Sequence, residues 1–195
     1  MEATGIIIVA AGNSSRLGQP KQLLEYNGHT LLRNTILQAQ RVPDSFVVVV
    51  TGAYKPIMDK ELAFTSAKVV HNAHWETGLA SSIVIGLHQL RAYKHDIKSC
   101  IITVCDQPYL TTEVFKRLTD EYKKTGKGII ASAYSGTMGT PVLFGNTYFK
   151  QLQNLTGDEG ARKLMQIYKD DVAVIPFEKG AVDIDTIEDY NNLIK

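Results

Sequence analysis

The stretch IIIVAAGNSSRLGQPKQLL, residues 6–24, decides the fold and supplies the first candidate site. Four apolar residues, Ile6–Val9, predict a buried strand, and the chain then enters a loop of small, polar and basic residues. Small side chains let a ligand approach the backbone, and basic side chains attract an anion. The question raised by this stretch is which anion the loop binds.

Length and composition narrow the classes of protein to consider. The 195 residues are 44% hydrophobic and 21% charged, with a formal net charge of +1, which fits a single domain over residues 1–195. A near-neutral chain lacks the basic field of a nucleic-acid-binding protein. No apolar run approaches the roughly 20 residues that span a bilayer, and we expect the apolar residues near the start to form a strand and not a signal segment. We expect a cytoplasmic protein that binds neither nucleic acid nor membrane, with Cys100 and Cys105 as buried free thiols.

The rest of the chain alternates between two apolar patterns. Runs of consecutive apolar residues predict strands at 5–11, 45–52, 67–72, 99–106, 128–134 and 171–177. Such runs are typical of strands covered on both faces, as in a parallel sheet. Helical spacing of apolar residues predicts three helices, around Leu32–Ala39, Ile83–Leu90 and Val114–Tyr122, the last with Thr111 as its N-cap. The alternation indicates the α/β class, and we expect segment 134–165 to be an insertion or a small lid-like element.

The loop after the first strand is the first candidate site. In an open α/β sheet, ligands bind outside the carboxyl ends of the strands. Ala10, Ala11 and Gly12 leave room for a phosphate chain near the backbone, and Arg16 and Lys21 add positive charge. The loop has neither the Walker A pattern nor the G-x-G-x-x-G pattern. The alternative is a surface loop in which the glycines only serve turns.

Carboxylates at two further places predict a metal site. Asp106 ends an apolar strand, where an isolated carboxylate costs free energy unless it is paired or binds a metal. Mg²⁺ commonly takes one or two carboxylates together with substrate phosphates, so we predict that Asp106 holds Mg²⁺. Asp183 and Asp185 lie two residues apart and point to the same side of an extended segment, so one of them could complete the site. The alternatives are a turn residue at Asp106 and acidic bias before a helix near Thr186.

Six motifs follow one another along essentially the whole chain. They are VAAGNSSRLGQPKQLL, NAHWETGLASSI, CDQPYLT, GTPVLF, GDEGAR and VDIDTIEDY. This set resembles the molybdenum cofactor cytidylyltransferases, within the larger group of nucleotidyltransferases that load nucleoside triphosphates onto phosphorylated acceptors. The resemblance implies a Rossmann-like three-layer sandwich of the nucleotide-diphospho-sugar transferase type, with a mostly parallel sheet. It also implies Mg²⁺-dependent transfer of CMP from CTP to the terminal phosphate of molybdopterin, with release of pyrophosphate. The AAG form of the first motif favours CTP over GTP, since guanylyl-transferring relatives resemble AGG.

The resemblance also implies roles for individual residues. The catalytic residues would be Arg16, Lys21 and Asp106. The nucleotide-binding residues would be Ala10, Ala11, Gly12, Ser14, Ser15, Arg16, Lys21, Gly78, Ser81 and Ser82. The acceptor-binding residues would be Gly139, Thr140, Pro141, Gly157, Asp158 and Arg162. The metal ligands would be Asp106 and Asp183, with Asp185 as the competitor for the second position.

The sequence departs from the family pattern at three positions. Thr140 stands where members often have His, Cys105 where many have Gly, and Ile187 where Pro is common. The change at Thr140 keeps open a second hypothesis, in which the acceptor is a sugar phosphate or a polyol phosphate. A third hypothesis is a nucleotide-binding maturation partner that hands the cofactor to a client molybdoenzyme with little turnover. The complete set of Arg16, Lys21 and Asp106 argues against a pure binding protein.

Overall fold

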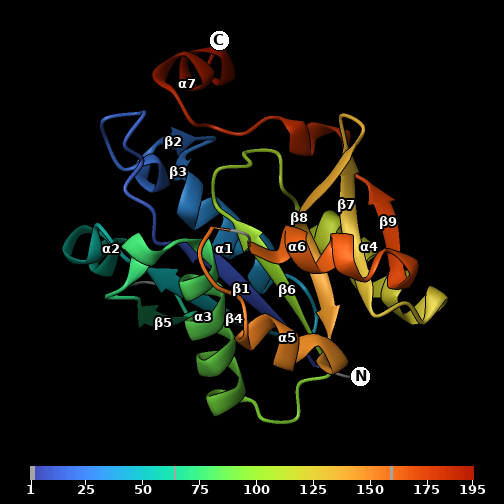
Figure 1. Cartoon of the computed structure of the whole chain (residues 1–195). Helices are drawn as coiled ribbons and strands as arrows, with labels where there is room; N and C mark the ends of the chain where they lie inside the picture. The colour runs from blue at the N-terminus through green and yellow to red at the C-terminus, as the bar shows by residue number, and fades with distance from the viewer. Residues whose placement is uncertain (1–2, 64, 159) are drawn as a thin grey trace.

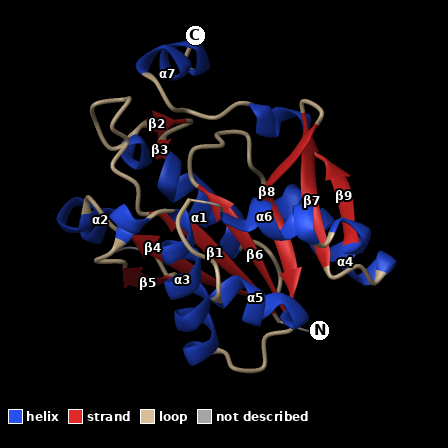
Figure 2. Ribbon diagram, viewed as in Figure 1, coloured by secondary structure: helices blue, strands red, loops and turns tan. Residues whose placement is uncertain are grey.

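The computed structural model describes residues 3–63, 65–158 and 160–195, and one seven-stranded sheet organises them (Figure 2). The strand order is β5-β4-β1-β6-β8-β7-β9. The bounds are β1 Thr4–Ala10, β4 Ser45–Thr51, β5 Lys68–His71, β6 Ser99–Val104, β7 Ile129–Tyr134, β8 Thr137–Gly145 and β9 Val172–Pro176. Strands β5, β4, β1 and β6 are mutually parallel, β8 runs antiparallel to β6 and β7, and β9 is parallel to β7. The expected mostly parallel sheet is confirmed.

Helices cover both faces of the sheet and make three layers (Figure 1). One face packs against α3 (Leu79–Tyr93), α5 (Phe149–Gln153) and α6 (Gly160–Ile167), and the other against α1 (Leu31–Gln40) and α4 (Thr112–Thr125). Strand β1 shows why its apolar residues are consecutive, because Ile7 and Val9 enter the first core and Ile6 and Ile8 the second. Helix α2 (Lys55–Leu62) adds Met58 and Leu62 to the second core. The structure also has helix α7 (Ile187–Leu193), a hairpin of β2 (Glu25–Tyr26) and β3 (His29–Thr30), and several short 3-10 helices.

The six strands and three helices predicted from the sequence are all present. Thr111 is the N-cap residue of α4, although its side chain makes no capping hydrogen bond. The prediction for segment 134–165 is wrong, because β8 within it lies inside the sheet between β6 and β7. Pro141 made this strand hard to predict from the sequence, since proline has no backbone N–H to donate to the hydrogen bonds of a sheet. The structure accommodates it at an irregularity, where the pairing shifts from Ala131–Val142 to Ser132–Gly139.

The sheet brings distant loops to one place. The carboxyl ends of the parallel strands β1, β4 and β6 lie at the same edge, so the loops that follow them are neighbours. The backbone N–H of Ala53, after β4, donates to the carbonyl oxygen of Ala11, after β1, over 3.1 Å. Within the described residues, no helix is both long enough and apolar enough to cross a membrane.

Candidate active site

The loop after β1 is held open by its own hydrogen bonds. The backbone N–H of Lys21 donates to Ser14 Oγ over 3.1 Å, and the carbonyl oxygen of Ser14 accepts from Leu17 and Gly18. Gln22 is buried and its Nε2 donates to the carbonyl oxygens of Ala10 and Gly12 over 3.1 and 2.9 Å. These bonds enclose a hollow of about 170 Å³, lined by Gly12, Asn13, Ser14, Ser15, Arg16, Lys21 and Asp185. Gln22, whose amide shapes this loop, was not among the residues predicted from the sequence.

Two cations and two carboxylates meet beside this loop. Lys21 Nζ lies 2.5 Å from Asp106 Oδ2 and 3.0 Å from Asp185 Oδ1, and Arg16 Nη2 lies 2.6 Å from Asp185 Oδ2. Burial alone would lower the pKa of Lys21, but the charges and hydrogen bonds of Asp106 and Asp185 outweigh burial and raise it. Burial alone would raise the pKa of Asp185, and Lys21 and Arg16 instead lower it. The two basic residues are therefore already arranged around anionic oxygen atoms.

The segment that carries Asp183 and Asp185 is tied to Asp106. Ile184 is buried between the two carboxylates, and its backbone N–H donates to the carbonyl oxygen of Asp106 over 3.0 Å. Burial and the negative charges of Asp185 and Asp106 raise the pKa of Asp183, in that order of effect. Asp185 is neutralised by both cations, whereas Asp183 forms no ion pair with another described residue. Asp183 is thus the freer carboxylate beside Asp106.

The carboxylates do not form a complete metal site by themselves. Among the described residues, no three His, Cys, Asp or Glu side chains are grouped closely enough to hold an ion. The arrangement fits Mg²⁺ only as a partly protein-bound ion, in which nucleotide phosphates provide the other oxygen ligands. The assignment of Asp106 and Asp183 as metal ligands stays a prediction.

Gly78, Ser81 and Ser82 lie at the N-terminus of α3, next to the loop after β5. Gly78 has a φ of 106°, and a Cβ there would lie 2.5 Å from the backbone carbonyl group of Gly157. The hydroxyl groups of Ser81 and Ser82 accept hydrogen bonds from Asn72 Nδ2 over 2.8 and 3.0 Å. Ser82 is 2% exposed. The two serines hold the loop at Asn72 in place, and their role in nucleotide binding stays a prediction.

A second cleft of about 380 Å³ opens between the sheet and helices α3 and α6. Four of the six predicted acceptor residues line it, namely Gly139, Thr140, Asp158 and Arg162. Of the other two, Pro141 is buried, and the backbone of Gly157 lies against Gly78. The walls are mostly apolar, formed by Val9, Leu79, Ile83, Ile102, Val104, Met138, Val142, Ala161 and Met165. The cleft suits a ligand with flat, apolar faces and a polar edge.

Tyr134, at the carboxyl end of β7, is a further residue of the cleft that was not predicted from the sequence. Its ring lines the cleft and packs edge-on against Phe177, and its hydroxyl fills the space that a Cβ on Gly139 would need. Burial raises the pKa of Tyr134 against the opposing hydrogen bonds of Thr140 and Gln107, and the charges of Asp183 and Asp106 add to the rise. The hydroxyl thus lies where the apolar cleft meets the carboxylates. Its position at the carboxyl end of a predicted strand is the signal that could have identified it.

The chain matches a known family over most of its length. Residues 6–173 match the MobA-like NTP transferase domain. The chain belongs to this family and is a nucleotidyltransferase, which confirms the resemblance carried by the six motifs.

Two relatives and one solved protein illustrate the relationship. The molybdenum cofactor cytidylyltransferase of Escherichia coli (strain K12) is 24% identical over 190 residues, which cover 97% of this chain and 95% of that protein. The nicotine blue oxidoreductase of Paenarthrobacter nicotinovorans is 27% identical over 203 residues, with coverage of 98% and 96%. The crystal structure of Rv0371c from Mycobacterium tuberculosis H37Rv has a TM-score of 0.85 and 27% identity, with coverage of 99% and 98%. Rv0371c is also solved in complex with manganese, with a TM-score of 0.81 and 25% identity. These similarities support the expected Rossmann-like three-layer fold.

Proposed function

We propose that this nucleotidyltransferase acts in molybdenum cofactor biosynthesis and transfers CMP from CTP to the terminal phosphate of molybdopterin, releasing pyrophosphate. The observation that carries the proposal is the cluster of Arg16 and Lys21 around Asp106 and Asp185, at the mouth of the loop after β1. The similarity to the cytidylyltransferase of Escherichia coli and the AAG form of the loop support CTP over GTP.

The arrangement of charges suits phosphoryl chemistry without a general base. The acceptor phosphate has a second pKa of about 6, so it is already ionised at neutral pH and can attack the α-phosphorus of CTP directly. Lys21 and Arg16 would exchange Asp185 for the oxygens of the triphosphate and stabilise the charge of the leaving pyrophosphate. Mg²⁺ bound by Asp106 and Asp183 would supply Lewis-acid stabilisation of the phosphate oxygens. In this proposal, the protein therefore accelerates the reaction by positioning the two substrates and by stabilising the charge that develops on the phosphates.

The second cleft supports molybdopterin over a sugar or polyol phosphate as the acceptor. Its walls are apolar, while Asp158 and Arg162 lie at its edge. A flat pterin ring can cover the apolar walls and use its polar edge for hydrogen bonds, whereas a polyol would leave those walls poorly covered. A client molybdoenzyme as protein partner, and the cytoplasm as the site of action, stay predictions.

The test is a pyrophosphate-release assay with purified protein, Mg²⁺ and molybdopterin, with each of CTP, GTP, ATP and UTP in turn. We expect release with CTP, loss of release without Mg²⁺, and loss of release in Asp106→Ala at unchanged fold. Release with GTP alone would reassign the nucleotide. Release with a sugar phosphate or polyol phosphate in place of molybdopterin would reassign the acceptor. Nucleotide binding without turnover on any acceptor would favour the maturation partner.

A further inference from the structure

A further hollow lies away from the loop after β1 and its cluster of Arg16, Lys21, Asp106 and Asp185, which we call the transfer site. It measures about 490 Å³, against about 380 and 170 Å³ for the two hollows described above. Three segments line it: the hairpin and first turns of α1 (26–38), the loop into α4 (108–117) and the turn after β9 (176–179). It therefore opens on the α1 and α4 face of the sheet, whereas the second cleft, in which we propose that the acceptor binds, opens on the α3 and α6 face. We name it the Tyr109 cleft.

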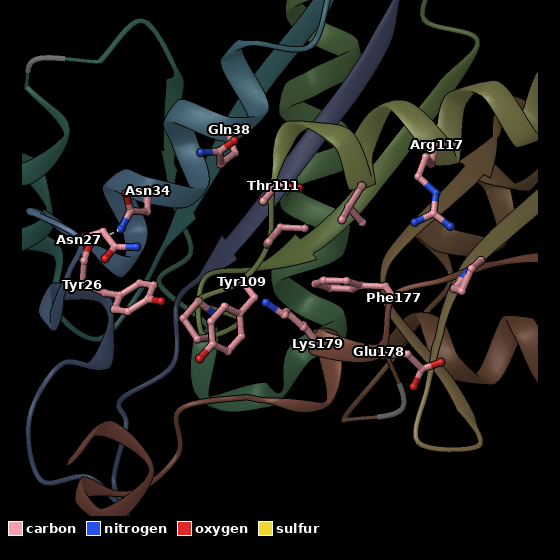
Figure 3. A pocket seen from close by; sticks show the side chains of 14 residues that line it. Tyr26, Asn27, Asn34, Gln38, Tyr109, Thr111, Arg117, Phe177, Glu178 and Lys179 are labelled. Carbon is pink, nitrogen blue, oxygen red and sulfur yellow. Dashed lines mark hydrogen bonds between the residues drawn. The ribbon is translucent and has the colours of Figure 1, made fainter. Parts of the chain in front are cut away.

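Aromatic rings form the centre of the Tyr109 cleft (Figure 3). The rings of Tyr26 and Tyr109 meet edge to face with centroids 6.1 Å apart, and Phe177 adds a third ring. The hydroxyl groups of the two tyrosines form no hydrogen bond with another described residue. Rings with free polar ends at an open hollow are suited to packing against a planar ring.

Positive charge flanks these rings from two elements. Lys179 Nζ lies 5.0 Å from the centroid of the Tyr109 ring, and Arg117 extends toward the cleft from α4 (Figure 3). Neither side chain forms an ion pair within the part of the chain that the structure describes. The carboxylate of Glu178 points away from the Tyr109 ring (Figure 3). The charge at the cleft is therefore complementary to an anion.

The rim carries hydrogen-bonding groups that the fold does not use. Asn34 Nδ2 donates to the carbonyl oxygen of Tyr26, and Gln38 Oε1 accepts from the backbone of Thr112. The other amide atoms, Asn34 Oδ1 and Gln38 Nε2, bond to no further residue among those described. These atoms can meet the polar edge of a heterocycle.

We propose that the Tyr109 cleft is a second ligand site, which binds a planar aromatic or heteroaromatic ring bearing a phosphate or carboxylate group. The site lies one loop away from the transfer site, because Tyr109 follows Asp106 in the same loop and Lys179 precedes Asp183. The proposal rests on the geometry of this cleft and does not depend on which nucleotide or acceptor the transfer site takes.

The test measures binding of defined probes to the full-length protein by saturation-transfer NMR. Flavin mononucleotide and 1-naphthoate supply an aromatic phosphate and an aromatic carboxylate. Riboflavin lacks the phosphate, and inorganic phosphate, added as a competitor, lacks the ring. We expect both anions to bind, riboflavin to bind about tenfold more weakly, and inorganic phosphate to compete poorly. Absence of binding by both anions, or equal binding of riboflavin, would overturn the proposal.

Variants locate the bound probe. Lys179→Glu and Arg117→Glu should each weaken binding of the anions by about tenfold, since each reverses one charge at the cleft. Lys123→Glu, in the last turn of α4, makes the same change of charge away from the cleft and should leave binding unchanged. Lys21→Ala shows which site the probe occupies, because this variant should weaken binding of a probe in the transfer site and leave binding in the Tyr109 cleft unchanged. Binding that is lost in Lys21→Ala and retained in both cleft variants would contradict the proposal, and thermal unfolding confirms that each variant is folded.

Discussion

At the scale of single residues, Lys21 is the central group of the site. Its ammonium group lies between Asp106 and Asp185, in the space beside the carboxylate that we expect to bind metal. A divalent ion on Asp106 Oδ2 would compete with Lys21 for the same oxygen, and a triphosphate offers Lys21 an alternative anion. Nucleotide and metal should therefore bind together more tightly than either binds alone.

This arrangement predicts opposite effects of Lys21→Ala on metal binding and on turnover. Without nucleotide, the variant should bind Mn²⁺ about tenfold more tightly than the wild type, because Asp106 loses its cationic neighbour. Nucleotide transfer should fall by about a hundredfold or more, since the cation on the triphosphate is lost. Free Mn²⁺ is measured by electron paramagnetic resonance, and Lys55→Ala, which removes a surface ion pair, serves as the control. Unchanged Mn²⁺ affinity would refute the competition.

Asp183 and Asp185 should respond to pH with opposite signs. The pKa of Asp185 is lowered in the folded protein, so its contribution to stability is present at neutral pH and is lost as the pH falls through that lowered value. The pKa of Asp183 is raised, so its ionisation destabilises the fold as the pH rises through the raised value. Asp183→Asn should raise the melting temperature at pH 7 and Asp185→Asn should lower it. Each effect should stay below about 1 kcal/mol, because both groups are solvent-accessible. The effect of Asp183→Asn should fade as the pH falls to about 4, whereas the effect of Asp185→Asn should persist there and fade only below about pH 4, near its lowered pKa.

A change at Tyr134 tests whether the second cleft binds the acceptor, because Tyr134 lines this cleft near the carboxylates. Tyr134→Phe keeps the ring on Phe177 and removes only the hydroxyl. We expect a rise of about tenfold in the KM for the acceptor, the size of one lost hydrogen bond, with unchanged stabilisation by CTP. Steady-state kinetics and thermal unfolding with CTP measure the two effects. A variant that loses CTP stabilisation as well would place Tyr134 on the nucleotide side.

At the scale of elements, the close packing of the loop at Gly157 on the start of α3 depends on a missing side chain. Gly78→Ala would add a Cβ 2.5 Å from the backbone of Gly157 at a φ that favours glycine. We expect a loss of about 2–4 kcal/mol and impaired acceptor binding. Gly136→Ala is the matched control, with a φ of 71° and no atom near the added Cβ, and should cost only about 1 kcal/mol. Equal losses in chemical denaturation would show that the close approach is unimportant.

Elements with an unbroken apolar pattern could be predicted from the sequence, and β8 could not. Strands such as β1 are buried on both faces, so their residues alone carry the signal. The nine residues of β8 include Pro141 and two glycines, and their place in the sheet depends on partners on both sides. Hydrogen bonds to the two neighbouring strands therefore stabilise β8 although its own sequence is unfavourable for a strand.

At the scale of the whole molecule, the candidate site combines parts that are local in sequence with parts that are not. The loop after β1 and Asp106 follow predicted strands, so the rule for strand ends could identify them as a candidate site. The pairing of Lys21 with Asp185 joins residues 164 positions apart, and no local pattern encodes it. The roles of Tyr134 and Gln22 likewise depend on neighbours supplied by other elements.

The link between Ile184 and Asp106 has a consequence for how the site can come apart. The sheet has all its strands by Pro176, whereas Asp183 and Asp185 lie beyond β9 and are anchored through Ile184. Local release of this segment would remove two charged groups from the site and leave the hydrogen-bond ladder of the sheet unbroken. Opening the site in this way costs less free energy than unfolding the sheet that carries it.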